Sequence, residues 1–124
     1  MNLIGSNVYG VSLSIEKNSH YENLKLNKKI KSKLLDIRNF KKLNQNLKLI
    51  KPDIVFHLAA QSLVKSSYLK PIETWSTNVM GTLNVIESIK SLNRKCTLII
   101  ITSDKCYLNK EKKSGYKESD ELGG

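Results

Sequence analysis

The chain has 124 residues, a formal net charge of +10 at pH 7 and a hydrophobic fraction of 40%. These values fit one modest globular domain and exclude a disordered chain, and no apolar run is long enough to cross a membrane. The first residues lack the basic and apolar regions of a signal peptide, so we expect a cytoplasmic protein. Cys96 and Cys106 have no partners at metal-ligand spacing, so we expect free thiols and no metal site.

The positive charge raises the question of nucleic-acid binding. Almost all of it is lysine, since Arg38 and Arg94 are the only arginines. Recognition of base edges and phosphates relies strongly on the planar fork of arginine, and these lysines are scattered without interleaved aromatic residues. We therefore expect no nucleic-acid partner, although the charge can steer an anionic ligand.

The first third of the chain predicts a strand, a polar loop and a second strand. Residues 1–6 resemble the end of a helix that closes on Gly5, because glycine favours the C-terminal cap. Apolar positions then predict a strand over residues 7–13. The following stretch is rich in lysine and asparagine and predicts a loop or weak helix. A short strand over residues 30–37 ends near Asp36.

The middle third predicts a helix and the most apolar strand. Asn39 is suited to cap a helix over residues 40–50, whose apolar positions recur at steps of three and four, and Pro52 ends it. The continuous apolar run in residues 53–60 predicts a strand buried on both faces of a parallel sheet. We expect His57, within that run, to be a satisfied core histidine.

The last third predicts a long helix and a final strand. Pro71 suits the first turn of a helix, and Ile72, Trp75 and further apolar residues trace one face of it. We therefore expect Trp75 in the core, and Asn78 to tie the helix to the sheet. Residues 98–101 predict the last strand, and a polar tail follows. The order of elements predicts an α/β fold, with a doubly wound parallel sheet.

Polar and small residues follow three of the predicted strands. They are Asp36, the run Ala59-Ala60-Gln61, and the run Thr102-Ser103-Asp104-Lys105. In an open parallel sheet the carboxyl ends of the strands face the ligand crevice. A carboxylate there can accept hydrogen bonds from adenine or ribose, and small residues let a phosphate approach. The hydroxyl, carboxylate and amine after the last strand suggest either acid/base chemistry on a small molecule or simply a polar turn.

Four motifs carry a resemblance to a known family. They are Asp-Ile-Arg at 36–38, Pro-Asp-Ile-Val-Phe-His-Leu-Ala-Ala-Gln at 52–61, Thr-Asn-Val-Met-Gly-Thr at 77–82 and Thr-Ser-Asp-Lys-Cys-Tyr at 102–107. In this order they resemble the extended short-chain dehydrogenase/reductases, and within these the nucleotide-sugar 4,6-dehydratases. Ser-Asp-Lys resembles the CDP-glucose 4,6-dehydratase branch best, since the dTDP-glucose branch usually has Thr-Asp-Glu there.

The resemblance implies tightly bound NAD as the cofactor and a nucleotide sugar, CDP-glucose in this branch, as the substrate. It implies that Asp36 and Ile37 contact the adenine. The other cofactor-binding residues that it implies are Leu58, Ala59, Ala60 and Gln61 along the phosphates and ribose, and Thr102 near the nicotinamide. For the full-length enzyme, a homodimer fits the same resemblance.

The same resemblance implies an internal redox cycle that converts CDP-glucose to CDP-4-keto-6-deoxyglucose. Hydride leaves sugar C4, a base removes the C5 proton, water leaves from C6, and the hydride returns to C6. Ser103 would hydrogen-bond the C4 oxygen, Asp104 would act as the acid at the C6 hydroxyl, and Lys105 as the base at C5. A lysine base must be neutral, which requires burial or cationic neighbours.

Two parts of the family's site have no counterpart in the sequence. No glycine-rich turn occurs, and the family's Tyr-x-x-x-Lys spacing occurs only at Tyr21 and Lys25, in the polar loop, which we interpret as chance. We therefore expect residues 1–124 to be a partial, Rossmann-like NAD-binding domain that lacks the first strand and the C-terminal substrate domain and is inactive alone. The alternatives are another NAD-dependent nucleotide-sugar epimerase or dehydratase, or a non-catalytic remnant of one.

Overall fold

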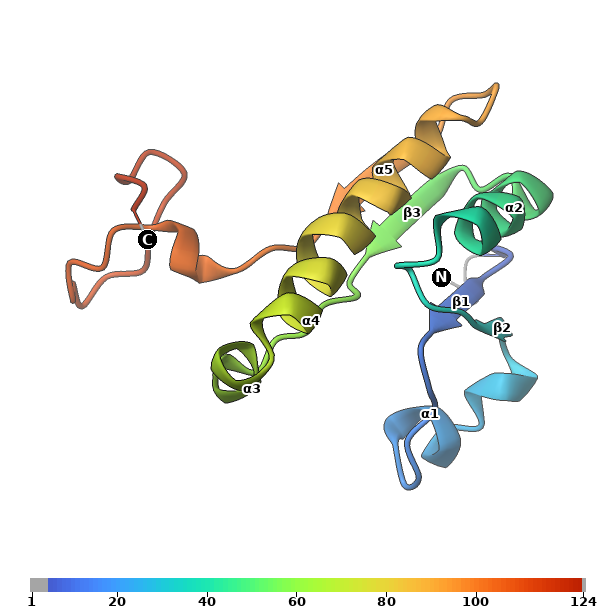
Figure 1. The fold of residues 1–124 in the computed structure, drawn as a ribbon, viewed down its shortest axis with the longest axis horizontal. Helices are drawn as coiled ribbons and strands as arrows, with labels where there is room; N and C mark the ends of the chain where they lie inside the picture. The colour runs from blue at the N-terminus through green and yellow to red at the C-terminus, as the bar shows by residue number, and fades with distance from the viewer. Residues whose placement is uncertain (1–4, 124) are drawn as a thin grey trace.

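The computed structural model describes residues 5–123, with the side chain of Asp104 excepted. The helix end predicted at residues 1–6 therefore lies mostly outside the described residues. The strands in Figure 1 are β1 (Tyr9–Ser12), β2 (Lys31–Leu34), β3 (Ile54–His57) and β4 (Thr97–Ile100). The helices are α1 (His20–Asn23), α2 (Phe40–Ile50), α3 (Val64–Leu69), α4 (Pro71–Trp75) and α5 (Gly81–Lys90). Single 3-10 turns form at Leu26–Lys28 and Asp104–Cys106, and a π-helical turn at Ser76–Met80 joins α4 to α5.

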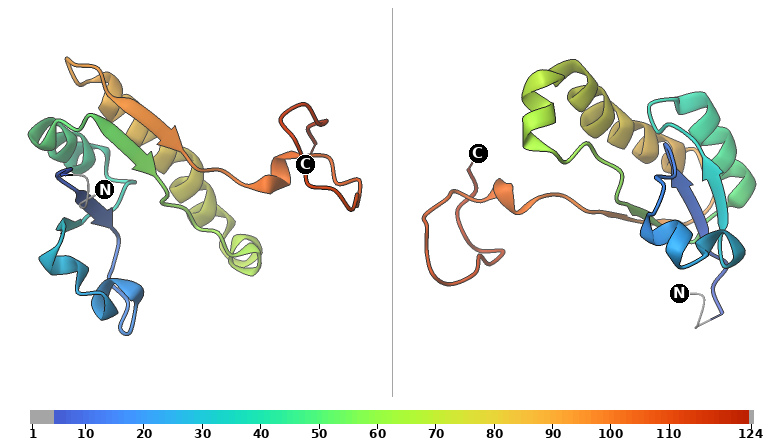
Figure 2. Two further views of the ribbon diagram at one scale, coloured as in Figure 1. Left: turned by 180° about the vertical axis from the view of Figure 1, so that it is seen from behind. Right: turned by 90° about the horizontal axis from the view of Figure 1, so that it is seen from below.

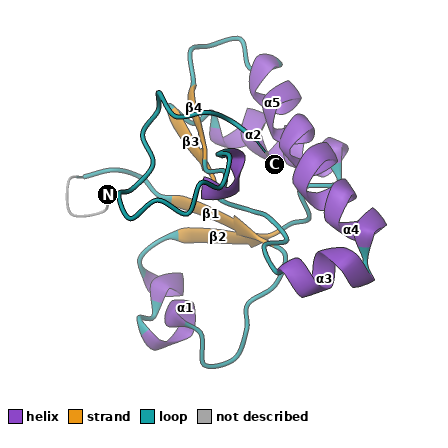
Figure 3. Cartoon of the chain, turned by 90° about the vertical axis from the view of Figure 1, so that its left-hand side faces the viewer, coloured by secondary structure: helices purple, strands orange, loops and turns teal. Residues whose placement is uncertain are grey.

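The strands pair in parallel, as the alternation of strands and helices predicts. β1 pairs with β2 from Tyr9 opposite Lys31, and β3 pairs with β4 from Ile54 opposite Thr97. The two pairs are separate sheets rather than the single sheet that we expected. Figure 3 shows the strands in the order β4, β3, β1, β2, with β3 and β1 on the inside. Among the described residues, no strand lies between those two to join the pairs.

Helix α2 has the predicted bounds and the predicted cap. The side chain of Asn39 accepts a hydrogen bond from the Lys42 N–H at 3.0 Å, which satisfies one of the free amides of the first turn. The helix ends at Ile50, where Lys51 takes a left-handed conformation with φ 52° and Pro52 follows. Capping and the apolar spacing together explain why this prediction was accurate.

The long helix buries a different face from the predicted one. Its buried residues are Gly81, Val85 and Ser88, whereas Ile72 and Trp75 are 85% and 67% exposed. The prediction that Trp75 is a core residue is therefore wrong. The π-helical turn at 76–80 rotates the residues before it relative to α5, and small residues at positions 81 and 88 let the helix lie close to its neighbours.

The core lies between α2, α5 and one face of β3 and β4. Its buried hydrophobic residues are Leu35, Leu43, Leu47, Val85 and Leu92, with Ile37, Val55, Ile89, Cys96 and Leu98 packed against them. A hydrogen bond of 2.7 Å from the Ser91 hydroxyl to Asn44 also joins the two helices. Each of these core residues contributes uncharged apolar surface, so the burial of that surface is the main stabilising contribution here.

Strand β3 is buried on one face only, which corrects the prediction of burial on both faces. Val55 packs against the core, but Ile54 and Phe56 on the opposite face are 55% and 42% exposed. Figure 2 shows β3 and β4 uncovered on the side away from α5. The apolar sequence of β3 is therefore typical of a strand covered on both faces, but the described residues supply no helix that covers its second face.

The predicted polar tail is a closed loop. Tyr107 forms an antiparallel bridge with Leu122, and its ring stacks on Tyr116 with centroids 5.1 Å apart. An ion pair between Lys112 and Asp120 closes the same loop. Figure 1 shows this segment extending away from the helices and strands, so residues 101–103 connect it to the end of β4.

Candidate functional site

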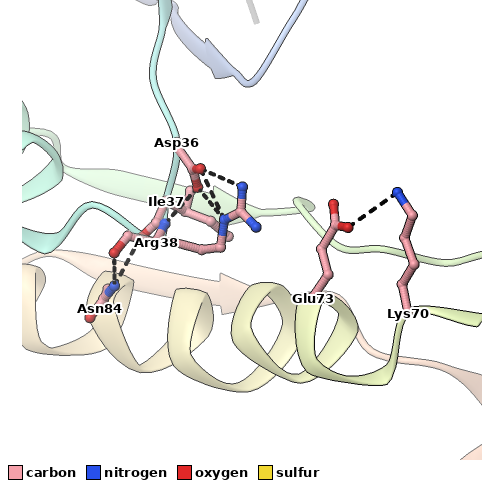
Figure 4. A network of polar contacts seen from close by, with 6 residues as sticks. All are labelled: Asp36, Ile37, Arg38, Lys70, Glu73 and Asn84. Carbon is pink, nitrogen blue, oxygen red and sulfur yellow. Dashed lines mark hydrogen bonds and ion pairs between the residues drawn. The ribbon is translucent and has the colours of Figure 1, made fainter. Parts of the chain in front are cut away.

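The loop after β2 presents a carboxylate held by an arginine. The Asp36 oxygens accept from Nε of Arg38 at 3.0 and 2.9 Å and from a terminal guanidinium nitrogen at 2.7 Å, and the backbone N–H of Arg38 donates at 2.9 Å. Figure 4 shows this arrangement. The hydrogen bonds from the Arg38 side chain hold the pKa of Asp36 below its ordinary value. Asp36 is half-buried, so its charge lies at the surface where a ligand can reach it.

The same loop is fixed to helix α5 (Figure 4). The Asn84 side-chain amide donates to the carbonyl oxygens of Ile37 and Arg38 at 3.0 and 3.1 Å. Gly81, one turn earlier, allows the close approach, because a Cβ atom there would lie 2.5 Å from Cδ1 of Ile37. The position of Asp36 is therefore set by the helix as well as by the strand before it.

The loop after β3 is fixed to the same helical segment. The Asn78 side chain accepts from the Gln61 N–H at 2.7 Å and donates to the Gln61 carbonyl at 2.9 Å. The Gln61 side chain donates to Thr74 at 3.0 Å and accepts from the Leu63 N–H at 2.6 Å. The prediction that Asn78 ties helix to sheet is confirmed. Gln61 is engaged by its backbone and by its side chain, so its main role in the described structure is to shape the loop.

His57 joins the end of β3 to the same helix. Its Nε2 atom lies 2.8 Å from the Thr82 hydroxyl, which donates to the Asn78 carbonyl at 2.6 Å. Because that hydroxyl proton is used, Nε2 of His57 donates to the Thr82 oxygen. His57 is buried, and burial lowers its pKa. The prediction of a satisfied core histidine is confirmed, because the ring is buried and has a partner in Thr82.

Both predicted cofactor loops therefore depend on one helical segment. Asn78 holds the Gln61 loop and Asn84 holds the Asp36 loop. Asn84 follows Asn78 by six positions, which corresponds to about 9 Å along a helix. Leu58, Ala59 and Ala60, which lie just before the anchored Gln61, are all exposed. One helical segment therefore holds both the loop with the Asp36 carboxylate and the loop with the exposed backbone of residues 58–60.

The predicted catalytic segment continues β4 beyond Ile100. His57 pairs with Ile100, and the Ile101 N–H donates to the His57 carbonyl at 3.1 Å, so residues 101–103 begin beside the start of the loop after β3. Thr102, Ser103 and Lys105 are exposed, and the Ser103 hydroxyl accepts from the Lys105 N–H at 3.2 Å. The backbone of Asp104 begins the short 3-10 turn, and its side chain lies outside the described structure.

The sequence did not reveal the residues that fix the Asp36 loop in place. Arg38 belongs to the Asp-Ile-Arg motif, but the sequence did not predict its hydrogen bonds to Asp36. It also did not predict the hydrogen bonds of Asn84 or the close packing of Gly81 against Ile37. One signal was available. Gly81, Val85 and Ser88 recur at helical spacing, and Asn84 flanks them, but small residues carry little weight in a hydrophobic pattern.

The described residues contain neither a metal-binding cluster nor a membrane-spanning helix. In residues 5–123, no group of three or more histidine, cysteine, aspartate or glutamate side chains is arranged to hold a metal ion. No helix in this part of the chain has the length and apolar character needed to span a membrane.

The sequence is similar to nucleotide-sugar enzymes. It is 48% identical over 106 residues to CDP-glucose 4,6-dehydratase of Salmonella typhimurium, which covers 86% of this chain and 30% of that protein. It is 31% identical over 102 residues to CDP-paratose 2-epimerase of Salmonella typhi, which covers 70% of this chain and 30% of the relative. The chain thus spans about 30% of the length of these relatives.

The fold is similar to that of nucleotide-sugar epimerases. UDP-glucose 4-epimerase of Stenotrophomonas maltophila, solved with NAD and formylated UDP-arabinopyranose, matches 98% of this chain and 37% of its own, with a TM-score of 0.81 and 18% identity. UDP-glucose 4-epimerase of Bifidobacterium longum, solved with NAD+ and UDP, matches 98% of this chain and 36% of its own, with a TM-score of 0.80 and 24% identity. These likenesses establish a Rossmann-type α/β fold. The model of the family described as GDP-mannose 4,6 dehydratase matches residues 4–123, and the chain belongs to that family.

Proposed function

We propose that this chain is the nucleotide-binding part of an NAD-dependent CDP-glucose 4,6-dehydratase. The observation that carries the proposal is the 48% identity with the Salmonella typhimurium dehydratase, against 31% with the CDP-paratose 2-epimerase over a similar length. Because the chain spans about 30% of the first relative, the activity is proposed for a whole protein that contains this chain.

The residues after β2 and β3 fit the adenosine half of NAD. Arg38 donates two hydrogen bonds to each Asp36 oxygen, so an adenine amino group or a ribose hydroxyl would bind Asp36 by sharing or displacing one of them. Ile37 offers an apolar contact, and the exposed segment Leu58–Ala60 offers backbone groups with little steric hindrance. NAD, when bound, would supply the hydride acceptor and donor for the sugar. We also propose that residues 1–124 belong to this cofactor-binding domain.

Thr102 and the three residues after it would lie beside the nicotinamide and the sugar, where the reaction takes place. Thr102 would lie near the nicotinamide, and Ser103 would donate a hydrogen bond to the sugar C4 oxygen. Asp104 would protonate the departing C6 hydroxyl, and Lys105 would remove the C5 proton. Lys105 is exposed in this chain. Its use as a base therefore requires that the substrate or further parts of the protein cover it.

The test is turnover of CDP-glucose by the whole protein in deuterium oxide. We expect the 4-keto-6-deoxy product with one deuterium at C5, because a base exchanges that proton with solvent. Lys105→Met should lower kcat by about 100-fold or more, whereas Lys113→Met, at an exposed lysine in the closed loop, should leave it unchanged. The 124-residue chain alone should form no keto sugar.

Other outcomes would identify the alternatives. Inversion of a hydroxyl of UDP-glucose without loss of water would replace the dehydratase with an epimerase, a class to which several of its relatives belong. No change in any of a panel of nucleotide sugars would indicate a non-catalytic protein with this fold. If Lys113→Met loses activity as well, the result would contradict a specific catalytic role for Lys105.

We further propose that the whole protein is a homodimer. Ile72, Trp75, Val79 and Met80 expose 85, 67, 46 and 50% of their surface along one helical segment. A single apolar stripe is self-complementary across a two-fold axis, so a second copy can cover it. Light scattering should give twice the protomer mass, and Trp75→Glu should give the protomer mass; a monomeric parent protein would contradict the proposal.

A further inference from the structure

The closed loop, residues 106–123, begins directly after Lys105. Its two ends are joined, because the Gly123 N–H donates to the Cys106 carbonyl at 3.0 Å. They are also tightly packed, since a Cβ atom at Gly123 would lie 3.1 Å from Cβ of Leu108. Cys106 is the last residue of the 3-10 turn that contains Lys105, so closure of the loop fixes one end of that turn.

Three side chains within the loop connect its interior to Tyr107. Lys112 forms an ion pair with Asp120, and these side chains are only 28 and 27% exposed, so water screens their attraction less than at an open surface. Nζ of Lys112 also lies over the ring of Tyr116, 4.7 Å from its centroid. That ring stacks on Tyr107 with centroids 5.1 Å apart. The contacts therefore run without a break from the ion pair to the residue that follows Cys106.

The acid/base segment, residues 103–105, lies between this loop and the sheet. On the sheet side, the Ile101 N–H donates to the His57 carbonyl at 3.1 Å. On the loop side, the Cys106 carbonyl is bonded to the far end of the closed loop. Both described side chains of the segment are exposed, so no core packing surrounds them in this chain. The position of the segment therefore depends on an anchor at each end.

We propose that the closed loop holds the acid/base segment in its working position, and that Lys112, Tyr116 and Asp120 are positioning residues for Lys105. They do not touch the reacting atoms, and they act by fixing Cys106, the residue after Lys105. A displacement of a catalytic group by about 1 Å can cost about 100-fold in rate, so a loosened loop should slow the chemical step. The proposal rests on the proposed dehydratase function.

The nucleotide half of the site should be independent of the closed loop. Asn78 and Asn84 hold the loops after β3 and β2, and Figure 1 shows the closed loop extending away from the helical segment that carries them. Loosening the closed loop should therefore lower kcat with little change in KM for CDP-glucose or in the amount of bound NAD. A residue with a general role in folding would change all three quantities.

The first test is turnover of CDP-glucose by the whole protein. Lys112→Met removes the ion pair and the cation over the ring, and it should lower kcat by about tenfold or more at nearly constant KM and bound NAD. Lys112→Arg keeps the charge and should restore most of the parent kcat. Lys113→Met, at the exposed neighbouring lysine, is the matched control and should change none of these quantities.

A second pair of variants tests the ring stack. Tyr116→Leu removes the ring and should lower kcat as Lys112→Met does. Tyr116→Phe keeps the ring and loses only the hydroxyl, which accepts from the Lys110 N–H and donates to Asn109, so it should retain most of the activity. The proposal is overturned if Lys112→Met and Tyr116→Leu keep the parent kcat. A rise in KM at constant kcat would also overturn it, and so would equal losses in Lys112→Met and Lys112→Arg.

Amide hydrogen exchange of the 124-residue chain separates this proposal from the dehydratase function. The Gly123 amide, bonded to Cys106, and the Lys105 amide, bonded to the Ser103 hydroxyl, should exchange about tenfold faster in Lys112→Met than in Lys113→Met. Equal exchange at Lys105 would overturn the positioning role, whatever the activity. Faster exchange in Lys112→Met, together with a parent protein that does not turn over CDP-glucose, would support the hold of the loop on the segment and reject the proposed reaction.

Discussion

The double hydrogen bond between Asn78 and the Gln61 backbone makes a quantitative prediction. Asn78→Ala removes both bonds, at 2.7 and 2.9 Å, from a half-buried position. Each contributes about 1 kcal/mol net, and alanine regains about 0.6 kcal/mol of helix propensity over asparagine. We therefore expect a loss of about 1.5 kcal/mol in the free energy of unfolding.

Urea unfolding of the chain provides the assay. With a slope near 1.5 kcal/mol/M, the loss lowers the midpoint by about 1 M. The Gln61 amide should also exchange about tenfold faster, because its acceptor is gone. Gln45→Ala, at an exposed position of α2, is the matched control and should change stability by less than about 0.5 kcal/mol.

A third variant separates the two hydrogen bonds. Asn78→Asp keeps an acceptor for the Gln61 N–H but places a second oxygen against the Gln61 carbonyl, so it should lose at least as much stability as the alanine variant. If Asn78→Ala unfolds at the same urea concentration as Gln45→Ala, and the Gln61 amide exchanges no faster, the inferred anchoring of this loop is refuted.

Three further changes test the core, the helix contact and the buried histidine. Leu43→Ala should cost about 2–5 kcal/mol in urea unfolding, whereas Leu49→Ala on the same helix, 81% exposed, should cost less than about 0.5 kcal/mol. Gly81→Ala should destabilise by about 1–3 kcal/mol, and Ile37→Ala should relieve most of this clash by removing Cδ1 and Cγ1; independent losses in the double variant would contradict the contact. Burial lowers the pKa of His57, so its contribution to stability is complete above about pH 6.5, the ordinary value, and declines as the pH falls. The free energy of unfolding should therefore change less between pH 7 and pH 5 in His57→Gln than in the parent chain. Equal changes in the two proteins would contradict this.

The sequence predicted a structural feature correctly where a single residue determines that feature. Asn39 caps α2 because its side chain meets a free amide, and a sequence shows that pairing directly. His57 and Asn78 could be assigned structural roles because a polar group in an apolar setting requires a partner. The sequence could not identify those partners, since Thr82 and Gln61 become neighbours only through the fold.

The failures have a physical cause in common. Trp75 was assigned to the core because it shares an apolar helical face with Leu83, but that face is exposed on both sides of the π-helical turn, with Leu83 45% exposed. Ile54 was assigned to a fully buried strand because its segment is apolar, and the burial of a face depends on which other segments cover it. A pattern reports what a residue prefers, whereas exposure depends on the neighbours that the chain supplies.

The contacts within the chain join three of the four motifs into one packed unit and leave the fourth motif apart from it. The motif at 77–82 binds the loops of two others, through Asn78 to Gln61 and through Gly81 against Ile37, so these three motifs form one packed unit. The fourth, at 102–107, is positioned against them by the β3–β4 register and then leaves the sheet. The nucleotide half of the proposed site is therefore held by contacts within this chain. The acid/base half, with Ser103 and Lys105 exposed, depends on what covers it in the whole protein, which is why Lys105 is tested there and Asn78 in the chain alone.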